Sequence, residues 1–319
     1  KGLLVQLKNP PVFQYENIKN GTLLMAYGYF LKLVIADRAA IVVNNIYGDY
    51  EAYSGIILLV GSLLFSVQIY CDFCGYSLLA MGAAEILGFK IIKNFEQPYL
   101  AVSVQDFWRR WHISLSSWFR DYVYFPLGGS RCSRSRRYAN LFVTFCVSGL
   151  WHGANWTYIV WGGINGALQI IGHFTMGFRK KVKEVLKVRD NCFSYRLFQK
   201  TVTFMLINMT WVFFKADNIK MAITILKNMC RCGNIWVLFD HSLLNLGLSS
   251  EEWFILVIAI MILIGVDLLH EKGVHLREKL SEQNFVFRWM VYISVTMVIL
   301  LFGVYGPRFS ASEFIYFQF

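Results

Sequence analysis

The sequence predicts an all-α fold, a polytopic integral membrane bundle of helices. Of its 319 residues, 56% are hydrophobic and only 16% are charged, whereas soluble domains carry roughly 25% charged residues. Residues 138–178 contain no Asp, Glu, Lys or Arg, and this run is long enough for about two bilayer crossings at roughly 20 residues each. Lys and Arg gather in short loops beside such apolar stretches, which is typical of cytoplasmic membrane loops.

The net charge of +11 does not indicate nucleic-acid binding. The basic residues lie next to apolar segments, where they interact with lipid headgroups and set the orientation of the spans. We therefore expect membrane lipids and no nucleic acid among the partners.

The seven cysteines do not form a recognisable metal or disulfide pattern. Cys71 and Cys74 make a single CxxC without a partner pair, and Cys230 and Cys232 do not complete a zinc motif. An odd count also argues against a full disulfide framework. We expect no metal site and interpret the cysteines as small apolar or unpaired residues.

The apolar segments predict a single membrane domain over residues 1–319. Residues 21–47 are largely apolar but carry Lys32, Asp37 and Arg38, so they form either a helix packed inside the bundle or an amphipathic surface element. Further candidate spans are residues 52–71, 73–88, 201–214, 253–269 and 289–306. The chain begins with Lys1 and shows no signal peptide. We expect it to lack the N-terminal transmembrane helices of a longer protein.

The uncharged run at residues 138–178 has basic residues at both ends. Those before it are Arg131, Arg134, Arg136 and Arg137, and those after it are Arg179, Lys180, Lys181 and Lys183. By the positive-inside rule both ends are cytoplasmic, so the run is expected to be a helical hairpin.

His152 lies inside this hairpin. Counted from Tyr138 at about 1.5 Å per residue, it is roughly 20 Å from the cytoplasmic edge and beyond the midplane. An imidazole at this depth is costly to keep and is a candidate functional residue for that reason.

Residues 103–121 form a second informative segment. Ser103 and Asp106 are spaced as a capping box, and Asp106 can pair with Arg110 one turn later. The helix that begins here carries too many charges for a span, so it lies at the interface or re-enters the protein. On one helix, His112 would share a face with Trp108 and Ser116. Its tryptophans are of the kind found at headgroup level or around a buried polar cavity: Trp108, Trp111 and Trp118.

Several motifs in a fixed order carry a resemblance to a known family. They are YCDFCGYS at 70–77, FWRRWHISLS at 107–116, YFPLGG at 124–129, GLWHGANW at 149–156 and FIYFQF at 314–319. From about residue 23 to 319 the chain resembles the membrane-bound O-acyltransferase family, in its bacterial branch of alginate O-acetylation and teichoic-acid D-alanyl transfer. Several motifs in one order are far more specific than any single motif.

The resemblance implies a multi-pass protein of the bacterial plasma membrane, with interfacial or re-entrant helices around a central tunnel. It implies an O-acyltransferase that binds no cofactor and takes an acyl group, expected to be acetyl, from a cytosolic thioester. The donor would be acetyl-CoA or an acyl carrier protein. The acceptor would be a hydroxyl of a cell-surface polysaccharide or of an extracytoplasmic partner transferase. His152 aligns with the catalytic histidine of the family, and His112 with the second histidine of this branch.

The chemistry of the residues agrees with these positions. An imidazole is suited to remove the proton of an attacking hydroxyl, which is the role expected of His152, with His112 assisting or positioning the donor. Asn155 could donate to the developing oxyanion, and the arginines could contact donor phosphates or anchor the interface. The candidate substrate- or donor-binding residues are Asn155, Trp151, Trp156, Arg109, Arg110 and Trp111.

Each assignment has an alternative that the sequence leaves open. His152 could be a hydrogen-bonded structural residue, and His112 could orient a helix or form a cavity wall. Ser148 lies one turn before His152 like a nucleophile beside a base, but a membrane-helix Ser more often bonds its own backbone. The whole chain could also be a proton-coupled transporter or channel, for which repeated halves would be expected. A third class is a non-catalytic scaffold that anchors a secreted partner.

Overall fold

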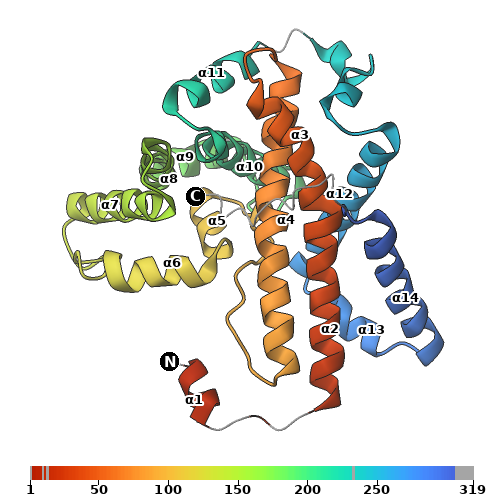
Figure 1. Cartoon of the computed structure of the whole chain (residues 1–319). Coiled ribbons are helices and arrows are strands. Elements are labelled where there is room, and N and C mark those ends of the chain that lie inside the picture. Colours follow the sequence, from red (N-terminus) through yellow and green to blue (C-terminus); the bar gives the residue numbers. More distant parts are fainter. Residues whose placement is uncertain (1, 9–10, 12–13, 232–233, 306–319) are drawn as a thin grey trace. The chain divides into compact units, whose positions relative to one another are not determined.

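The computed structural model describes residues 2–8, 11, 14–231 and 234–305, and the regular elements in these ranges are helices (Figure 1). The predicted all-α class is confirmed. The predicted motif at 314–319 lies outside the described residues. The α-helices are α1 (Gly2–Lys8), α2 (Tyr15–Tyr29), α3 (Asp37–Gly48), α4 (Ile56–Ile86), α5 (Val104–Arg110), α6 (Ile113–Phe119), α7 (Arg134–His152), α8 (Trp156–Phe174), α9 (Met176–Val185), α10 (Phe193–Lys215), α11 (Ile219–Met229), α12 (Ser250–Glu271), α13 (Leu276–Ser281) and α14 (Phe285–Phe302). Short π-helices lie at η1 (Phe30–Ala36) and η3 (Arg120–Tyr124), and 3-10 turns at η2 (Pro98–Leu100), η4 (Ile235–Leu238) and η5 (Ser242–Leu246).

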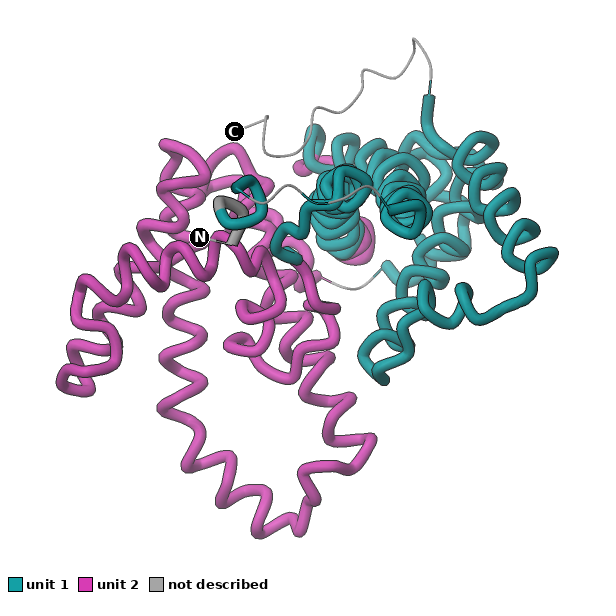
Figure 2. Tube along the Cα trace, turned by 90° about the horizontal axis from the view of Figure 1, so that it is seen from below, with its two compact units in different colours: residues 1–49, 63–94, 234–318 teal, residues 50–62, 95–233, 319 magenta. Residues whose placement is uncertain are grey.

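The described chain divides into two compact units (Figure 2). Unit 1 is built from residues 1–49, 63–94 and 234–318, and unit 2 from residues 50–62 and 95–233. Helix α4 contributes its first residues to unit 2 and the rest to unit 1. The single domain expected from the sequence remains a prediction.

In unit 1, α2 and α4 lie side by side in backbone contact (Figure 1). A Cβ added at Gly21 would lie 2.5 Å from the carbonyl oxygen of Gly82, and one added at Gly28 would lie 2.8 Å from that of Gly75. Small residues at such crossings let two helices approach closely in an apolar medium. Bulkier side chains at these glycines would separate the helices.

Residues 15–48 form the continuous helical path α2–η1–α3. Most residues of η1 and α3 are buried, including Lys32, Asp37 and Arg38, so this segment is the packed helix of the two alternatives that the sequence allowed. The Lys32 ammonium lies 2.7 Å from the Asp72 carboxylate and 2.9 Å from that of Asp37. Asp72 and Asp37 thus share one lysine inside the bundle, which pairs the charges that lie there.

Four described helices are long and apolar enough to cross a membrane: α4, α10, α12 and α14. Helices α7 and α8 have 19 residues each, about 28 Å at 1.5 Å per residue, which is close to the thickness of the hydrocarbon core. They are not among the four because α7 starts with arginines and α8 carries Asn165, Gln169 and His173. Two crossings at residues 138–178 therefore remain a prediction.

The hairpin itself is present, since α7 and α8 pack against each other along their length (Figure 1). A Cβ added at Gly149 would lie 2.1 Å from the carbonyl oxygen of Tyr158, and one at Gly162 would lie 2.2 Å from that of Phe145. Residues 153–155 form the turn. The glycines thus place the helix that ends at His152 in direct backbone contact with α8.

The sidedness of the hairpin can be tested by cysteine labelling. Ser135, near the start of α7, and Lys181, on α9 just after α8, are both exposed. In a cysteine-free background, Ser135→Cys and Lys181→Cys should both react with an impermeant thiol reagent only when it reaches the cytoplasmic face, because both are flanked by basic residues. Labelling of the two from opposite sides would contradict the hairpin topology.

Candidate functional site

A cavity of about 520 Å³ lies within unit 2, between the α5–α6 segment and the α7–α8 hairpin. Both histidines singled out from the sequence, His112 and His152, line it. They come from different segments, 40 positions apart in the chain. The fold therefore brings the two sequence motifs to one site.

One face of α7 forms a wall of the cavity. The lining residues on this helix recur every three or four positions, as expected for a single helical face: Arg137, Tyr138, Leu141, Thr144, Phe145, Ser148 and His152. From Arg137 to His152 this wall is roughly 22 Å long at 1.5 Å per residue. The cavity thus joins the basic start of α7 to the histidine at its end.

His152 is enclosed by aromatic rings at the end of α7. It is 8% exposed, and its ring centroid lies 5.0 Å from that of Trp151, 5.4 Å from Trp161 and 5.2 Å from Phe214. Trp161 and Phe214 are themselves almost fully buried. Such surroundings hold the imidazole in one orientation and exclude bulk water from part of its surface.

His112 does not lie within a continuous helix, as expected from the sequence, but at a break. Helix α5 ends at Arg110, Trp111 is extended, and His112 adopts a left-handed conformation with φ 44° and ψ 55° before α6 begins. A left-handed non-glycine residue costs roughly 1–2 kcal/mol, and such residues often lie at functional sites. The Nδ1 of His112 is 3.5 Å from Oγ of Ser114.

The predicted start of this segment is confirmed. The Ser103 hydroxyl accepts a hydrogen bond from the Asp106 amide at 3.1 Å, and the Asp106 carboxylate pairs with Arg110, also at 3.1 Å. Arg110 is occupied by this pair and does not line the cavity, whereas Arg109 and Trp111 do. The donor-binding role predicted for these three residues remains untested.

Three of the candidate binding residues lie around the hairpin turn. The Oδ1 of Asn155 accepts from the Thr157 amide at 3.1 Å and caps α8, while its Nδ2 donates to the carbonyl oxygen of Asp217 at 2.9 Å. Trp151 and Trp156 are 52% and 71% exposed, and neither they nor Asn155 line the cavity. Their substrate-binding role remains a prediction.

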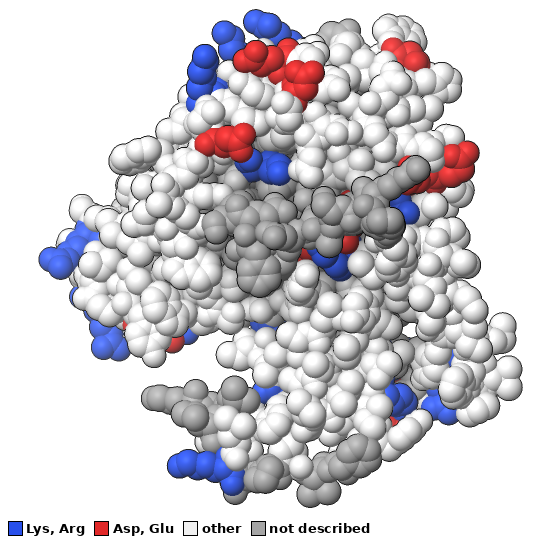
Figure 3. Space-filling view, viewed as in Figure 1, with Lys and Arg blue, Asp and Glu red and all other residues white. Residues whose placement is uncertain are grey.

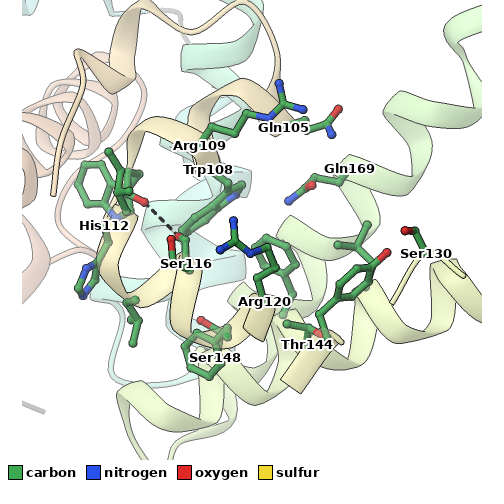
Figure 4. Close-up of a pocket in the computed structure, with 18 of the residues that line it drawn as sticks. Gln105, Trp108, Arg109, His112, Ser116, Arg120, Ser130, Thr144, Ser148 and Gln169 are labelled. Carbon is green, nitrogen blue, oxygen red and sulfur yellow. Dashed lines mark hydrogen bonds between the residues drawn. The ribbon is translucent and has the colours of Figure 1, made fainter. Parts of the chain in front are cut away.

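Sequence reasoning missed several polar residues of the cavity. On α8 they are Gln169 and His173, which lie one helical turn apart. Figure 4 shows the Gln169 amide extending from α8 into the space that the Arg120 guanidinium also enters, with the His112 imidazole at one end of the lining. Residues 138–178 carry no charged side chain on any helix face, so charge does not mark the face that lines the cavity. The only sequence signal for that face is helical spacing counted from His152. The other missed polar residues are Gln105, Ser130, Arg137 and Thr144.

The cavity lining is positively charged. It contains Arg109, Arg120 and Arg137 and, in the described part of the chain, no Asp or Glu. Arg120 is paired with Asp121 beside the cavity, with Nε 2.8 Å from the carboxylate. Further basic residues gather over the loop between α6 and α7, on the left of Figure 3; they are Arg131, Arg134 and Arg136, all exposed. This end of the cavity favours an anionic group such as a phosphate.

No group of His, Cys, Asp and Glu within the described ranges is arranged to hold a metal ion. Cys71 and Cys74 are both buried in α4.

Comparison with known proteins gives a consistent result. The family described as "MBOAT, membrane-bound O-acyltransferase family" matches residues 18–214. A probable alginate O-acetylase of Pseudomonas putida is 32% identical over 99% of this chain and 64% of its own length. A peptidoglycan O-acetyltransferase of Helicobacter pylori is 36% identical over 77% of this chain and 44% of its own length.

A teichoic acid D-alanyltransferase of Bacillus subtilis is more distant, with 35% identity over 39% of this chain and 34% of its own length. The chain spans about one to two thirds of the length of these three relatives. Both histidines of the cavity lie inside the residues that match the family.

Proposed function

This chain belongs to the membrane-bound O-acyltransferase family, and we propose that the full protein transfers an acyl group from a thioester to a hydroxyl at the cavity of unit 2. The observation that carries the proposal is the meeting of His112 and His152 on one cavity whose other wall residues include three arginines. The transferred group is an acetyl group, which agrees with the names of the O-acetylase and O-acetyltransferase relatives.

In the proposed reaction, His152 acts as the general base. Its imidazole takes the proton of the acceptor hydroxyl, whose oxygen forms a bond to the thioester carbonyl carbon. The carbon–sulfur bond then breaks, and the leaving thiolate takes the proton from the imidazolium. The products are an ester and a free thiol, so atoms and charge balance without a bound cofactor.

The proposed donor is a phosphate-bearing thioester, as in acetyl-CoA or an acyl carrier protein, entering from the cytoplasmic side. Arg109, Arg120 and Arg137 would hold its phosphate groups, since guanidinium groups bind phosphate oxygens strongly. The α7 wall from Arg137 to His152 would guide the thioester toward the histidines.

The proposed acceptor is a hydroxyl of a cell-surface polysaccharide, reached directly or through an extracytoplasmic partner transferase. Relatives are named for alginate, peptidoglycan and teichoic acid, which supports a polymer outside the membrane. A bacterial membrane location follows from the family and from the four apolar helices.

The experiment that tests this function compares the cell-surface polymers of cells with and without the gene by mass spectrometry. Loss of ester-linked acetyl groups on deletion, with recovery when the wild-type gene is returned, is the expected result. Unchanged acylation of all surface polymers would contradict the proposed acceptor class.

The proposed roles of the histidines also predict a graded effect. His112→Ala should lower thioester turnover less than His152→Ala does, because the base remains when an assisting group is removed. Turnover of both variants is compared in the full-length protein. A larger loss for His112→Ala would reverse the assignment of the base.

A further inference from the structure

The buried amide of Asn165 links the two sides of the cavity. Asn165 lies on α8 and is 0% exposed. Its Oδ1 accepts a hydrogen bond from Nε1 of Trp108 at 3.3 Å, and its Nδ2 donates one to the carbonyl oxygen of Trp161 at 2.9 Å. A buried amide is costly unless it is hydrogen-bonded, and here both of its polar atoms have partners.

Trp108 connects this amide to the turn that carries His112. It lies on α5, four positions before His112, and lines the cavity. Its ring packs edge-on against Phe145 of α7, with 5.3 Å between centroids, and against Trp161 of α8, with 5.6 Å. Trp161 in turn contacts the ring of His152 at 5.4 Å. Ring contacts therefore run from α5, the helix that leads into the His112 turn, to His152.

The hydrogen bond from Trp108 to Asn165 adds a directional constraint that the aromatic contacts lack. Aromatic pairs accept a range of offsets and tilts, so ring contacts alone constrain the position of α5 along the hairpin less sharply than a directional bond does. A hydrogen bond restricts both distance and direction. The bond from Trp108 to Asn165 therefore fixes the position of α5 along α8.

We propose that Asn165 is a positioning residue which, through Trp108, sets where the His112 turn stands relative to His152. The proposal rests on the acyl transfer proposed above. Asn165 itself does not line the cavity, so it acts on the reaction only through Trp108. Catalysis is sensitive to such placement, because a displacement of about 1 Å costs up to about 10²-fold in rate.

Two variants break the same bond from opposite ends. Asn165→Leu keeps the size of the side chain but removes both polar groups, and Trp108→Phe removes the indole donor. In the full-length protein reconstituted in lipid, each should lower kcat for thioester turnover about 10- to 100-fold, with a much smaller change in the donor KM. The double variant should be no slower than the slower single variant, because the bond that Trp108→Phe removes is already absent in Asn165→Leu.

Asn208→Leu provides a matched control. Asn208 lies on α10, is 1% exposed and donates to the Ser62 hydroxyl at 3.1 Å, and neither residue lines the cavity. This variant also removes a buried amide and should lose stability, yet its kcat should stay near that of the wild type. If Asn165→Leu does not fold, Trp108→Phe carries the test.

Hydrogen exchange of residues 111–116 supplies a readout that needs no turnover. We expect this turn to exchange faster in Asn165→Leu and Trp108→Phe than in the wild type and Asn208→Leu. The positioning role would be overturned by unchanged exchange or an unchanged kcat in the single variants. It would also be overturned if the decreases in kcat multiply in the double variant, or if only the donor KM changes. A wild-type protein that releases no thiol would instead overturn the proposed function, and the exchange result would still decide the role of Asn165.

Discussion

Replacing His152 by Ala is expected to lower acyl transfer by about 10²- to 10⁴-fold while the protein remains folded and inserted. This is the factor by which a positioned general base typically accelerates a reaction. His152 lies at the end of α7 and contacts aromatic rings, so the truncation removes ring contacts without removing a helix. The measurement is thioester-dependent acylation by the purified full-length variant at matched protein concentration.

His275→Ala is the matched control for this loss. His275 is exposed at the start of α13, in unit 1, and far in sequence from the cavity motifs. It should retain wild-type acylation. Near-normal acylation by His152→Ala at normal yield would remove His152 from the mechanism.

The second large effect is expected for Gly149→Ala. The new Cβ would lie 2.1 Å from the carbonyl oxygen of Tyr158, and a backbone oxygen cannot move aside as a flexible side chain can. Overpacking typically costs about 1–3 kcal/mol even where side chains can adjust. Helices α7 and α8 would have to separate one turn before His152, so we expect both a lower melting temperature and loss of acyl transfer.

Gly172→Ala tests whether this effect comes from helix contact or from the loss of a glycine. Gly172 lies on α8 of the same hairpin, and nothing is within 4 Å of a Cβ added there. Because Ala is the better helix former by about 1 kcal/mol, this variant should be as stable as the wild type or more stable. Equal behaviour of the two variants would show that α7 and α8 are not in backbone contact at Gly149.

The hairpin and its histidine could be predicted from sequence because they depend on local patterns. Absence of charge over residues 138–178 and basic residues at both ends are visible without a structure. The start of α5 was also predictable, since the Ser103 cap and the Asp106–Arg110 pair need only residues within one or two turns.

The break at His112 could not be predicted from the same kind of pattern. The segment FWRRWHISLSSWF contains no Gly or Pro, so it is compatible with an uninterrupted helix. In the structure Trp111 is 2% exposed and packs against Trp211 with 5.0 Å between ring centroids. Contact with α10, a hundred positions later in the chain, therefore accompanies the change of backbone direction, and no local signal reports it.

Asn155 shows how one residue type can serve two purposes. Asn is both a possible oxyanion donor and one of the preferred residues at the start of a helix. The structure places it at the start of α8.

The hydrogen bond of Asn165 could not be predicted from the sequence. Asn165 is a polar residue in a predicted span, and its partner, Trp108, comes from a segment 57 positions away.

Acyl transfer and transport by the histidine cavity give different results in sealed vesicles. Free thiol released from an acyl thioester is followed with the full-length protein, with any secreted partner supplied and no ion gradient. For an acyltransferase we expect thiol release that needs an acceptor hydroxyl and is lost in His152→Ala. Ion or solute flux that depends on a gradient, with thiol release at background, would contradict acyl transfer and assign the intramembrane histidines to a transport path.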